Sequence, residues 1–128
     1  MLSPIACKTN QEYKLEAEQL RTTLPDEYRR TGMISSSTYQ VYYRVMARDQ
    51  ADAESIAKNE SEQYALKYLL QEPFIYVTIS QYGVQRLQDL IKKKGQVVAV
   101  QKANDADYYE IVYHITDYGL REQFQYIR

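Results

Sequence analysis

The sequence predicts a small α+β domain in which two helices cover one face of a largely antiparallel sheet of three or four strands. Three observations lead to this fold class. Apolar residues alternate in four short segments, as in half-buried strands. Two longer segments repeat their apolar residues at helical spacing. The length of 128 residues suits one domain with a short arm. The expected order after an N-terminal helix is β-α-β-α-β-β.

Residues 1–37 are expected to form an N-terminal arm and an amphipathic helix. The segment from Thr9 to Glu12 has the spacing of a capping box, and Pro25 ends the helix that follows it. One narrow apolar stripe runs along this helix: Tyr13, Ala17, Leu20 and Leu24. Because the stripe lies outside the main pattern, the helix packs either on its own domain or on a partner. A polar linker, residues 31–38, comes next.

The central domain is expected to span residues 38–116 and to open with a strand. Apolar residues alternate from Tyr39 to Val45, which places them on one face of that strand. Asp49 is a suitable cap for a helix that runs to about Leu70. The polar stretch 59–62 interrupts the apolar stripe of this segment, so one helix and two shorter helices both remain open.

A second strand is expected from Phe74 to Ile79, directly after Pro73. Ser80 then begins the helix with the clearest stripe in the chain. Its last turn holds Lys92, Lys93 and Lys94, whose charges suit the negative end of the helix dipole. The lysine run therefore needs no ligand to explain it. Gly95 is expected to end the helix in the left-handed conformation.

Two further strands close the domain. The third is expected at 96–102, a hairpin turn at 103–107, and the fourth from Tyr108 to Ile115. Residues 117–128 form a C-terminal tail. Their apolar residues fit either a short helix or a tail strand.

The chain offers little that could form a catalytic, cofactor or metal site. His114 is the only histidine, and alternation gives it the same strand face as Tyr108, Glu110 and Val112, so we expect an ordinary strand histidine. Cys7 is the only cysteine, which excludes an internal disulfide and fits a reducing compartment. We therefore expect a protein that is not an enzyme and holds no cofactor.

Charge and hydropathy limit the partner classes. The chain has 16 basic and 17 acidic residues, so no net basic field attracts nucleic acid. No apolar stretch approaches the ~20 residues of a membrane-spanning helix, and direct membrane insertion is not expected. The 14 tyrosines, against two phenylalanines and no tryptophan, favour surfaces that become buried on assembly. The candidate partner-binding residues are Tyr13, Leu20, Tyr42, Tyr76, Tyr82, Arg86 and Tyr108.

One stretch resembles a known family. Phe74–Tyr82, Val84–Leu87 and Lys93–Val100 together read as a strand, a short helix with a Gln-Arg-Leu core, a glycine and a valine-rich strand. This pattern is similar to the CpcD-like domain of phycobilisome linker proteins, and the likeness spans residues 39–102. The N-terminal helix and the fourth strand are additions to the family's pattern.

The resemblance implies a non-catalytic phycobilisome linker. Such a protein is a pigment-free plug in the central hole of phycobiliprotein discs, in the cytoplasm and peripheral to the cytoplasmic face of the thylakoid membrane. Tyr42, Tyr82 and Arg86 would then be buried only in the complex, and the N-terminal arm would make a second contact. The main alternative is a ferredoxin-like adaptor or regulatory domain that binds another protein complex. A nucleic-acid-binding domain and an enzyme with a site that no linear motif reveals also stay open.

Overall fold

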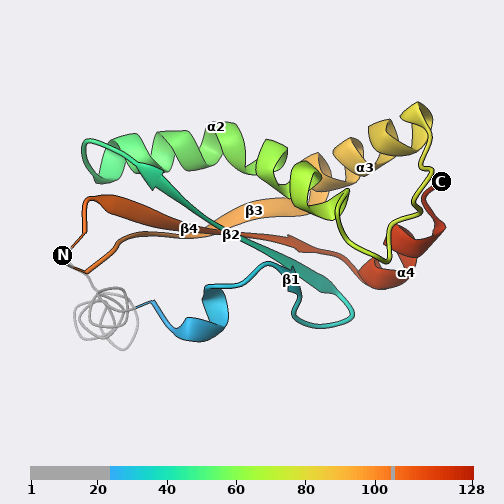
Figure 1. Ribbon diagram of the computed structural model, residues 1–128, viewed down its shortest axis with the longest axis horizontal. Helices are drawn as coiled ribbons and strands as arrows, with labels where there is room; N and C mark the ends of the chain where they lie inside the picture. The colour runs from blue at the N-terminus through green and yellow to red at the C-terminus, as the bar shows by residue number, and fades with distance from the viewer. Residues whose placement is uncertain (1–23, 105) are drawn as a thin grey trace.

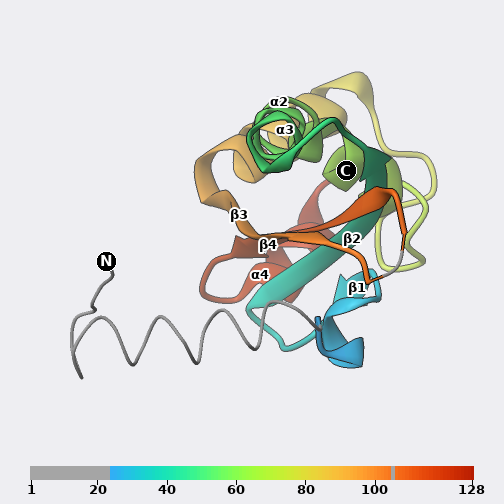
Figure 2. The same cartoon turned by 90° about the vertical axis from the view of Figure 1, so that its left-hand side faces the viewer.

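The computed structural model describes residues 24–104 and 106–128, and it confirms the α+β class (Figure 1). Four antiparallel strands form one sheet in the order β1-β2-β4-β3. Helices α2 and α3 lie over one face of this sheet, whereas β1 forms one edge of it and the segment before β1 lies on the side away from the helices (Figure 2). The elements are the 3-10 helix η1 (Asp26–Tyr28), β1 (Gly32–Met33), β2 (Thr38–Met46), α2 (Gln50–Leu69), α3 (Gln81–Lys94), β3 (Gly95–Lys102), β4 (Tyr108–Thr116) and α4 (Leu120–Tyr126).

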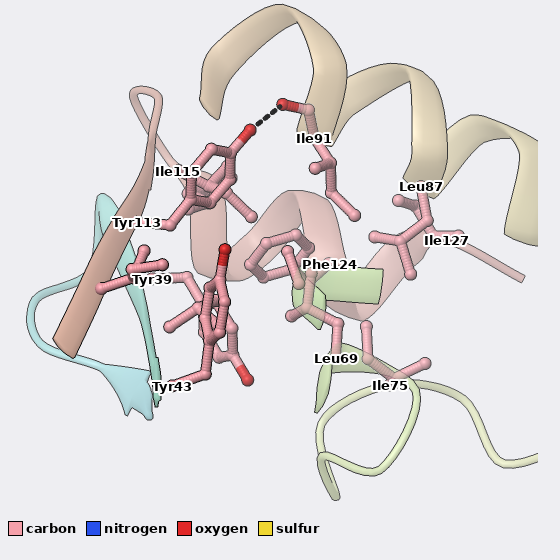
Figure 3. Packing of buried hydrophobic residues seen from close by; sticks show 14 of the residues in the cluster. Tyr39, Tyr43, Leu69, Ile75, Leu87, Ile91, Tyr113, Ile115, Phe124 and Ile127 are labelled. Atoms are coloured by element: carbon pink, nitrogen blue, oxygen red, sulfur yellow. Dashed lines mark hydrogen bonds between the residues drawn. The ribbon is translucent and has the colours of Figure 1, made fainter. Parts of the chain in front are cut away.

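The two longest strands, β2 and β4, pair at the centre of the sheet. They are antiparallel and in register from Thr38 opposite Thr116 to Met46 opposite Tyr108. The predicted alternation is confirmed in both, because every second side chain points to the helices. The residues buried on this face are Tyr39, Val41 and Tyr43 of β2, with Tyr109, Ile111, Tyr113 and Ile115 of β4. Figure 3 shows this face packed against side chains of α2, α3 and α4.

Helix α2 is one continuous helix, which settles the alternative that the sequence left open. Asp49 caps it as predicted and accepts a hydrogen bond from the backbone N–H of Asp52 at 2.9 Å. Its buried residues recur every four positions and are small apart from the last: Ala53, Ala57, Ser61, Ala65 and Leu69. Ser61 continues the stripe because it is buried and hydrogen-bonded to the Tyr43 hydroxyl at 2.7 Å. The polar stretch 59–62 therefore does not break the helix, because Ser61 within it forms a buried hydrogen-bonded pair with Tyr43.

The strand predicted at 74–79 is wrong. These residues form turns between α2 and α3, in which the Ile75 N–H bonds the Glu72 carbonyl and the Ile79 N–H bonds the Tyr76 carbonyl. Ile75 is buried and Val77 is 91% exposed, so the alternating apolar residues do not share one environment. Because local turns satisfy these backbone groups, the segment pairs with no strand. The fourth strand is β1 instead, and the order of strands and α-helices is β-β-α-α-β-β-α.

Helix α3 begins as predicted, with Ser80 accepting a hydrogen bond from the Gly83 N–H at 3.0 Å. Its end differs from the prediction. Gly95 has φ −93° and ψ 148°, an extended conformation, and it is the first residue of β3. The glycine is required for another reason: a Cβ there would overlap the Tyr113 hydroxyl and lie 2.6 Å from the Ile91 carbonyl oxygen. Close packing, not a left-handed turn, selects glycine.

Described residues on both sides of the predicted central domain pack onto it. The C-terminal tail forms helix α4, whose Leu120 and Phe124 are fully buried, and Phe124 stacks on Phe74 with ring centroids 5.8 Å apart. Leu24 is also buried. The packed body thus includes residues outside 38–116 at both ends. The helix predicted before Pro25 lies outside the described residues, apart from Leu24.

Removal of the Ser61 hydroxyl tests the buried pair in α2. Ser61→Ala leaves the buried Tyr43 hydroxyl without a partner, and we expect a loss of about 1–3 kcal/mol in the free energy of unfolding. The double variant Ser61→Ala with Tyr43→Phe removes both polar groups and should lose less than the sum of the single variants. Urea unfolding of the four proteins measures this. Strictly additive losses would contradict the pairing.

Gly95→Ala tests the close packing between α3 and β4. The added methyl must displace the Tyr113 ring or the Ile91 carbonyl, and we expect a loss of roughly 1–3 kcal/mol in unfolding free energy. Adding Tyr113→Phe removes the nearest atom and should recover part of it. Thermal and urea unfolding provide the measurement, with the neighbouring exposed substitution Gln96→Ala as a control. A Gly95→Ala protein as stable as wild type would refute this packing.

Candidate interaction surface

Exposed apolar side chains gather at one end of the molecule. Among the described residues, nine large apolar or aromatic side chains are exposed: Ile34, Met46, Leu70, Tyr76, Val77, Tyr82, Val98, Tyr118 and Tyr126. Six of them come from the 70–80 connection, the start of α3 and the α4 region. Figure 1 shows that these segments and the C-terminus lie together at the same end of the long axis. The gathering marks this end as the strongest candidate for a contact surface.

The C-terminal residue lies against the start of α3. The Ser80 hydroxyl donates to the backbone oxygen of Arg128 at 2.8 Å. Gly83 provides the necessary room, because a Cβ there would lie 2.6 Å from the Arg128 carbonyl carbon. The Arg128 guanidinium stacks over the Tyr76 ring, 4.5 Å from its centroid. These contacts connect three separate segments of the chain into one surface.

An open groove of about 720 Å³ lies between α3 and α4 and continues this surface. The half-buried Leu90 and the buried Ile127 give it an apolar lining. Its charged groups include Arg86 and Lys93 as well as Glu122. Tyr118 and Tyr126 line it from the α4 side, and Arg86 sits 6.0 Å from the ring centroid of Tyr82. We call Tyr76, Tyr82, Arg86, Tyr118, Tyr126 and Arg128 the α3–α4 surface.

The chemistry of the α3–α4 surface suits protein binding. Tyr118 is 95% exposed, Tyr82 74% and Tyr126 71%, so large aromatic areas face solvent. Tyrosine and arginine are the residue types that supply most binding energy in protein interfaces, where the rings are desolvated and the guanidinium stacks on them. An open groove with charges of both signs favours a partner of mixed polarity over a small ligand, which needs enclosure.

The structure brings together three of the seven candidates that the sequence singled out: Tyr76, Tyr82 and Arg86. Tyr42 and Tyr108 lie on the other face of the sheet, and Tyr13 and Leu20 lie outside the described residues. Sequence reasoning missed Tyr118, Tyr126 and Arg128. The spacing of Tyr118, Glu122 and Tyr126 matched one face of a helix, opposite Leu120, Phe124 and Ile127, and was the signal for them.

A buried ion pair organises the second face of the sheet. Arg29 makes two hydrogen bonds to Glu110, at 2.7 and 3.2 Å, and the Glu110 side chain is 3% exposed. The Tyr42 hydroxyl also donates to this carboxylate, at 2.5 Å. Burial disfavours the charged carboxylate, but the bonds from Arg29 and Tyr42 outweigh it and lower the pKa of Glu110. The ion pair anchors the segment before β1 to the sheet.

Tyr42 and Tyr108 therefore have structural partners within the chain. Arg44 donates from Nε to the Tyr42 hydroxyl at 2.9 Å, and its guanidinium lies 4.8 Å from the centroid of the Tyr108 ring. Desolvation, together with the bond to Glu110, raises the pKa of Tyr42. These rings support the packing of the second face and are not part of the α3–α4 surface.

His114 is a structural histidine on the same face. Gln40 donates its amide N–H groups to the carbonyl oxygens of Glu27 and Arg30, at 3.0 and 2.9 Å. Its amide oxygen lies 2.9 Å from Nε2 of His114, so Nε2 carries the proton in this bond. The ring stacks near Tyr28, and burial lowers its pKa. The bond to Gln40 holds the ring in its packed position, and burial favours its neutral form.

Comparison with known proteins gives no relative: no family model, curated protein or solved structure matches this chain. Within residues 24–104 and 106–128, no helix has the combination of length and hydropathy that crossing a bilayer requires. The same residues contain no group of three or more histidine, cysteine or acidic side chains arranged to hold a metal ion. The class that the fold defines is therefore a small α+β protein whose most prominent surface feature is a cluster of tyrosine and arginine.

Glu110→Gln tests the buried ion pair. The amide keeps the shape but loses the charge that Arg29 faces, and we expect unfolding free energy to fall by about 2 kcal/mol near neutral pH. The pKa of Glu110 is lowered on folding, so its stabilisation is complete above the unfolded value of 4.5 and is lost as pH falls through the folded value.

The difference between Glu110→Gln and wild type should therefore shrink as urea unfolding is repeated at increasingly acidic pH. The matched control is Asp26→Asn, which removes the 98% exposed carboxylate that contacts the same arginine, and it should leave stability unchanged. Equal effects of the two substitutions would show that burial does not govern this pair.

Proposed function

We propose that this protein is a non-catalytic assembly protein that binds other protein subunits through the α3–α4 surface. The observation that carries the proposal is the gathering of Tyr82, Tyr118 and Tyr126 with Arg86 around one open groove. Each ring is mostly exposed in the single chain, and removing such rings from water is a main source of binding energy. A rigid frame supports them, since α3 and α4 both pack into the core through Leu87 and Phe124.

The partner class to test first is the phycobiliprotein disc of a light-harvesting antenna. Two observations support this choice. Residues 74–102 resemble the CpcD-like domain of phycobilisome linkers, and Tyr76, Tyr82 and Arg86 of the surface lie in that stretch. The order of helix, glycine and valine-rich strand that carries the resemblance also occurs in α3, Gly95 and β3. Such a linker would lie at the cytoplasmic face of the thylakoid membrane and bind no pigment itself.

One observation favours a second candidate, an adaptor or regulatory domain that binds another protein complex. The strand that the resemblance implied at 74–79 is replaced by turns, so this part of the chain departs from the linker pattern. The α3–α4 surface serves such an adaptor equally well, because its chemistry specifies a protein partner and not a particular one. The identity of the bound subunits separates the two candidates.

A mild affinity purification of the tagged protein from its native cell extract tests the proposal. For an antenna linker, the eluate shows the visible absorption of bilin pigments, and the co-purified subunits are phycobiliproteins. A colourless eluate that contains one other complex in stoichiometric amount selects the adaptor. An eluate that contains the tagged protein alone, even after chemical cross-linking in the cell, would contradict both.

Substitutions on the α3–α4 surface should weaken this binding without unfolding the protein. For Tyr82→Ala combined with Arg86→Glu, and for Tyr118→Ala combined with Tyr126→Ala, we expect the dissociation constant of the purified complex to rise by roughly tenfold or more. Biolayer interferometry with the recovered partner measures it. Met46→Ala removes a similarly exposed apolar side chain, 70% exposed, at the end of β2 and serves as the control. Equal binding by all variants would exclude this surface.

A further inference from the structure

Strand β3 is an edge strand with an uncharged, apolar centre. In the order β1-β2-β4-β3 it pairs with β4 on one side, and no other described strand pairs with it. The central residues Val97 to Val100 include no charge and no proline, and Val98 is 39% exposed. Proteins normally protect a free edge with lysine, proline or a covering segment, because unpaired backbone groups recruit another strand. A β-bulge between Val97 and Ala99 interrupts the strand, and Val97 and Val100 on either side of it both pack partly against the core.

The backbone of β3 is already engaged from its open side. The amide nitrogen of Gln50 donates to the Val100 carbonyl oxygen at 2.9 Å, so this carbonyl points away from β4. The N–H and C=O of one strand residue point to the same side, and the Val100 N–H therefore also faces outward. The exposed Gln50 side chain therefore occupies the position from which a backbone N–H of an added strand would donate to the Val100 carbonyl oxygen. Displacing it costs little, because water can satisfy the freed amide.

A groove of about 570 Å³ runs between this edge and helix α2. Three polar residues of α2, spaced four apart, line it: Gln50, Glu54 and Lys58. The groove thus carries one negative and one positive charge along a single helix face. This stripe is complementary to its own reverse, because an antiparallel copy brings acidic and basic side chains within reach of each other.

The sequence of β3 is also nearly unchanged when its order is reversed. Residues 96–101 read Gln-Val-Val-Ala-Val-Gln, and the reversed order differs only in the exchange of the central valine and alanine. An antiparallel copy centred between Val98 and Ala99 places glutamine opposite glutamine and Val97 opposite Val100. Such cross-strand pairs of like polarity stabilise a sheet. An unrelated acidic peptide would be attracted by the charge of Lys58 but repelled by that of Glu54.

We infer that two copies of this chain associate antiparallel through their β3 edges, with the α2 stripes meeting across a two-fold axis. The two four-stranded sheets then form one continuous sheet, and both free β3 edges are covered. The interface uses neither side of the α3–α4 groove, so it is independent of the proposed function. A dimer would present two copies of the α3–α4 surface to its partners, which increases binding through avidity.

Sedimentation equilibrium of the full chain over a range of concentrations tests the inference. The expected mass rises from that of one chain, 15.1 kDa, toward twice this value. Val98→Glu places two like charges beside the two-fold axis and should abolish the association. Val77→Glu puts the same charge on a 91% exposed valine far from β3 in sequence and should leave it unchanged. Circular dichroism establishes that both variants are folded.

A charge exchange tests the two-fold arrangement itself. Glu54→Lys and Lys58→Glu each create like charges across the axis and should weaken dimerisation by roughly tenfold, whereas the double variant restores it. Three results would overturn the inference: a wild-type chain that stays monomeric at every concentration, equal association of Val98→Glu and Val77→Glu, or a double variant as weak as the single ones. A wild-type monomer that still binds its partner would leave the proposed function standing.

Discussion

The antiparallel pairing of β2 with β4 is the interaction on which the rest of this structure depends. Its register joins nine residues of each strand and decides which side chains face the helices. On one face it aligns Tyr39, Tyr43 and Tyr113 with the core. On the other it brings Tyr42 within reach of Glu110, which Arg29 neutralises. A shift of one residue would exchange the two faces and bury the polar set against the helices.

Tyrosine makes this arrangement possible because each ring has an apolar body and a polar tip. Tyr43 stacks on Tyr64 with centroids 4.0 Å apart and bonds Ser61, while the Tyr39 hydroxyl donates to Glu72 at 2.7 Å. Burial raises the pKa of Tyr43 and of Tyr113 to about 12, and the Tyr113 hydroxyl donates a hydrogen bond to the Ile91 carbonyl oxygen at 3.4 Å. No buried side-chain polar atom among the described residues lacks a partner. The tyrosine surplus therefore serves the core as well as the surface.

The tyrosines outside the core fall into two groups. Tyr42 and Tyr108 on the second sheet face are half-buried and contact Arg44, whereas the tyrosines around the α3–α4 groove are exposed on a rigid support. This contrast is the physical basis for a protein partner at α3 and α4. The free edge of β3 is a second, different kind of surface, in which backbone groups and not aromatic rings would supply the contacts.

The sequence by itself determined the features that depend on neighbours in the chain. The caps at Asp49 and Ser80, the lysine-rich end of α3 and the alternation in β2 and β4 all follow from local spacing, and they gave the α+β class. Tertiary structure alone decided the rest. Residues Phe74–Ile79 form turns and not a strand because Phe74 and Ile75 both pack into the core. Gly95 is needed because the side chain of Tyr113, eighteen residues away in the sequence, lies where a Cβ would be. The α3–α4 surface joins residues 76 to 128, and contacts between such distant segments leave no period in a sequence.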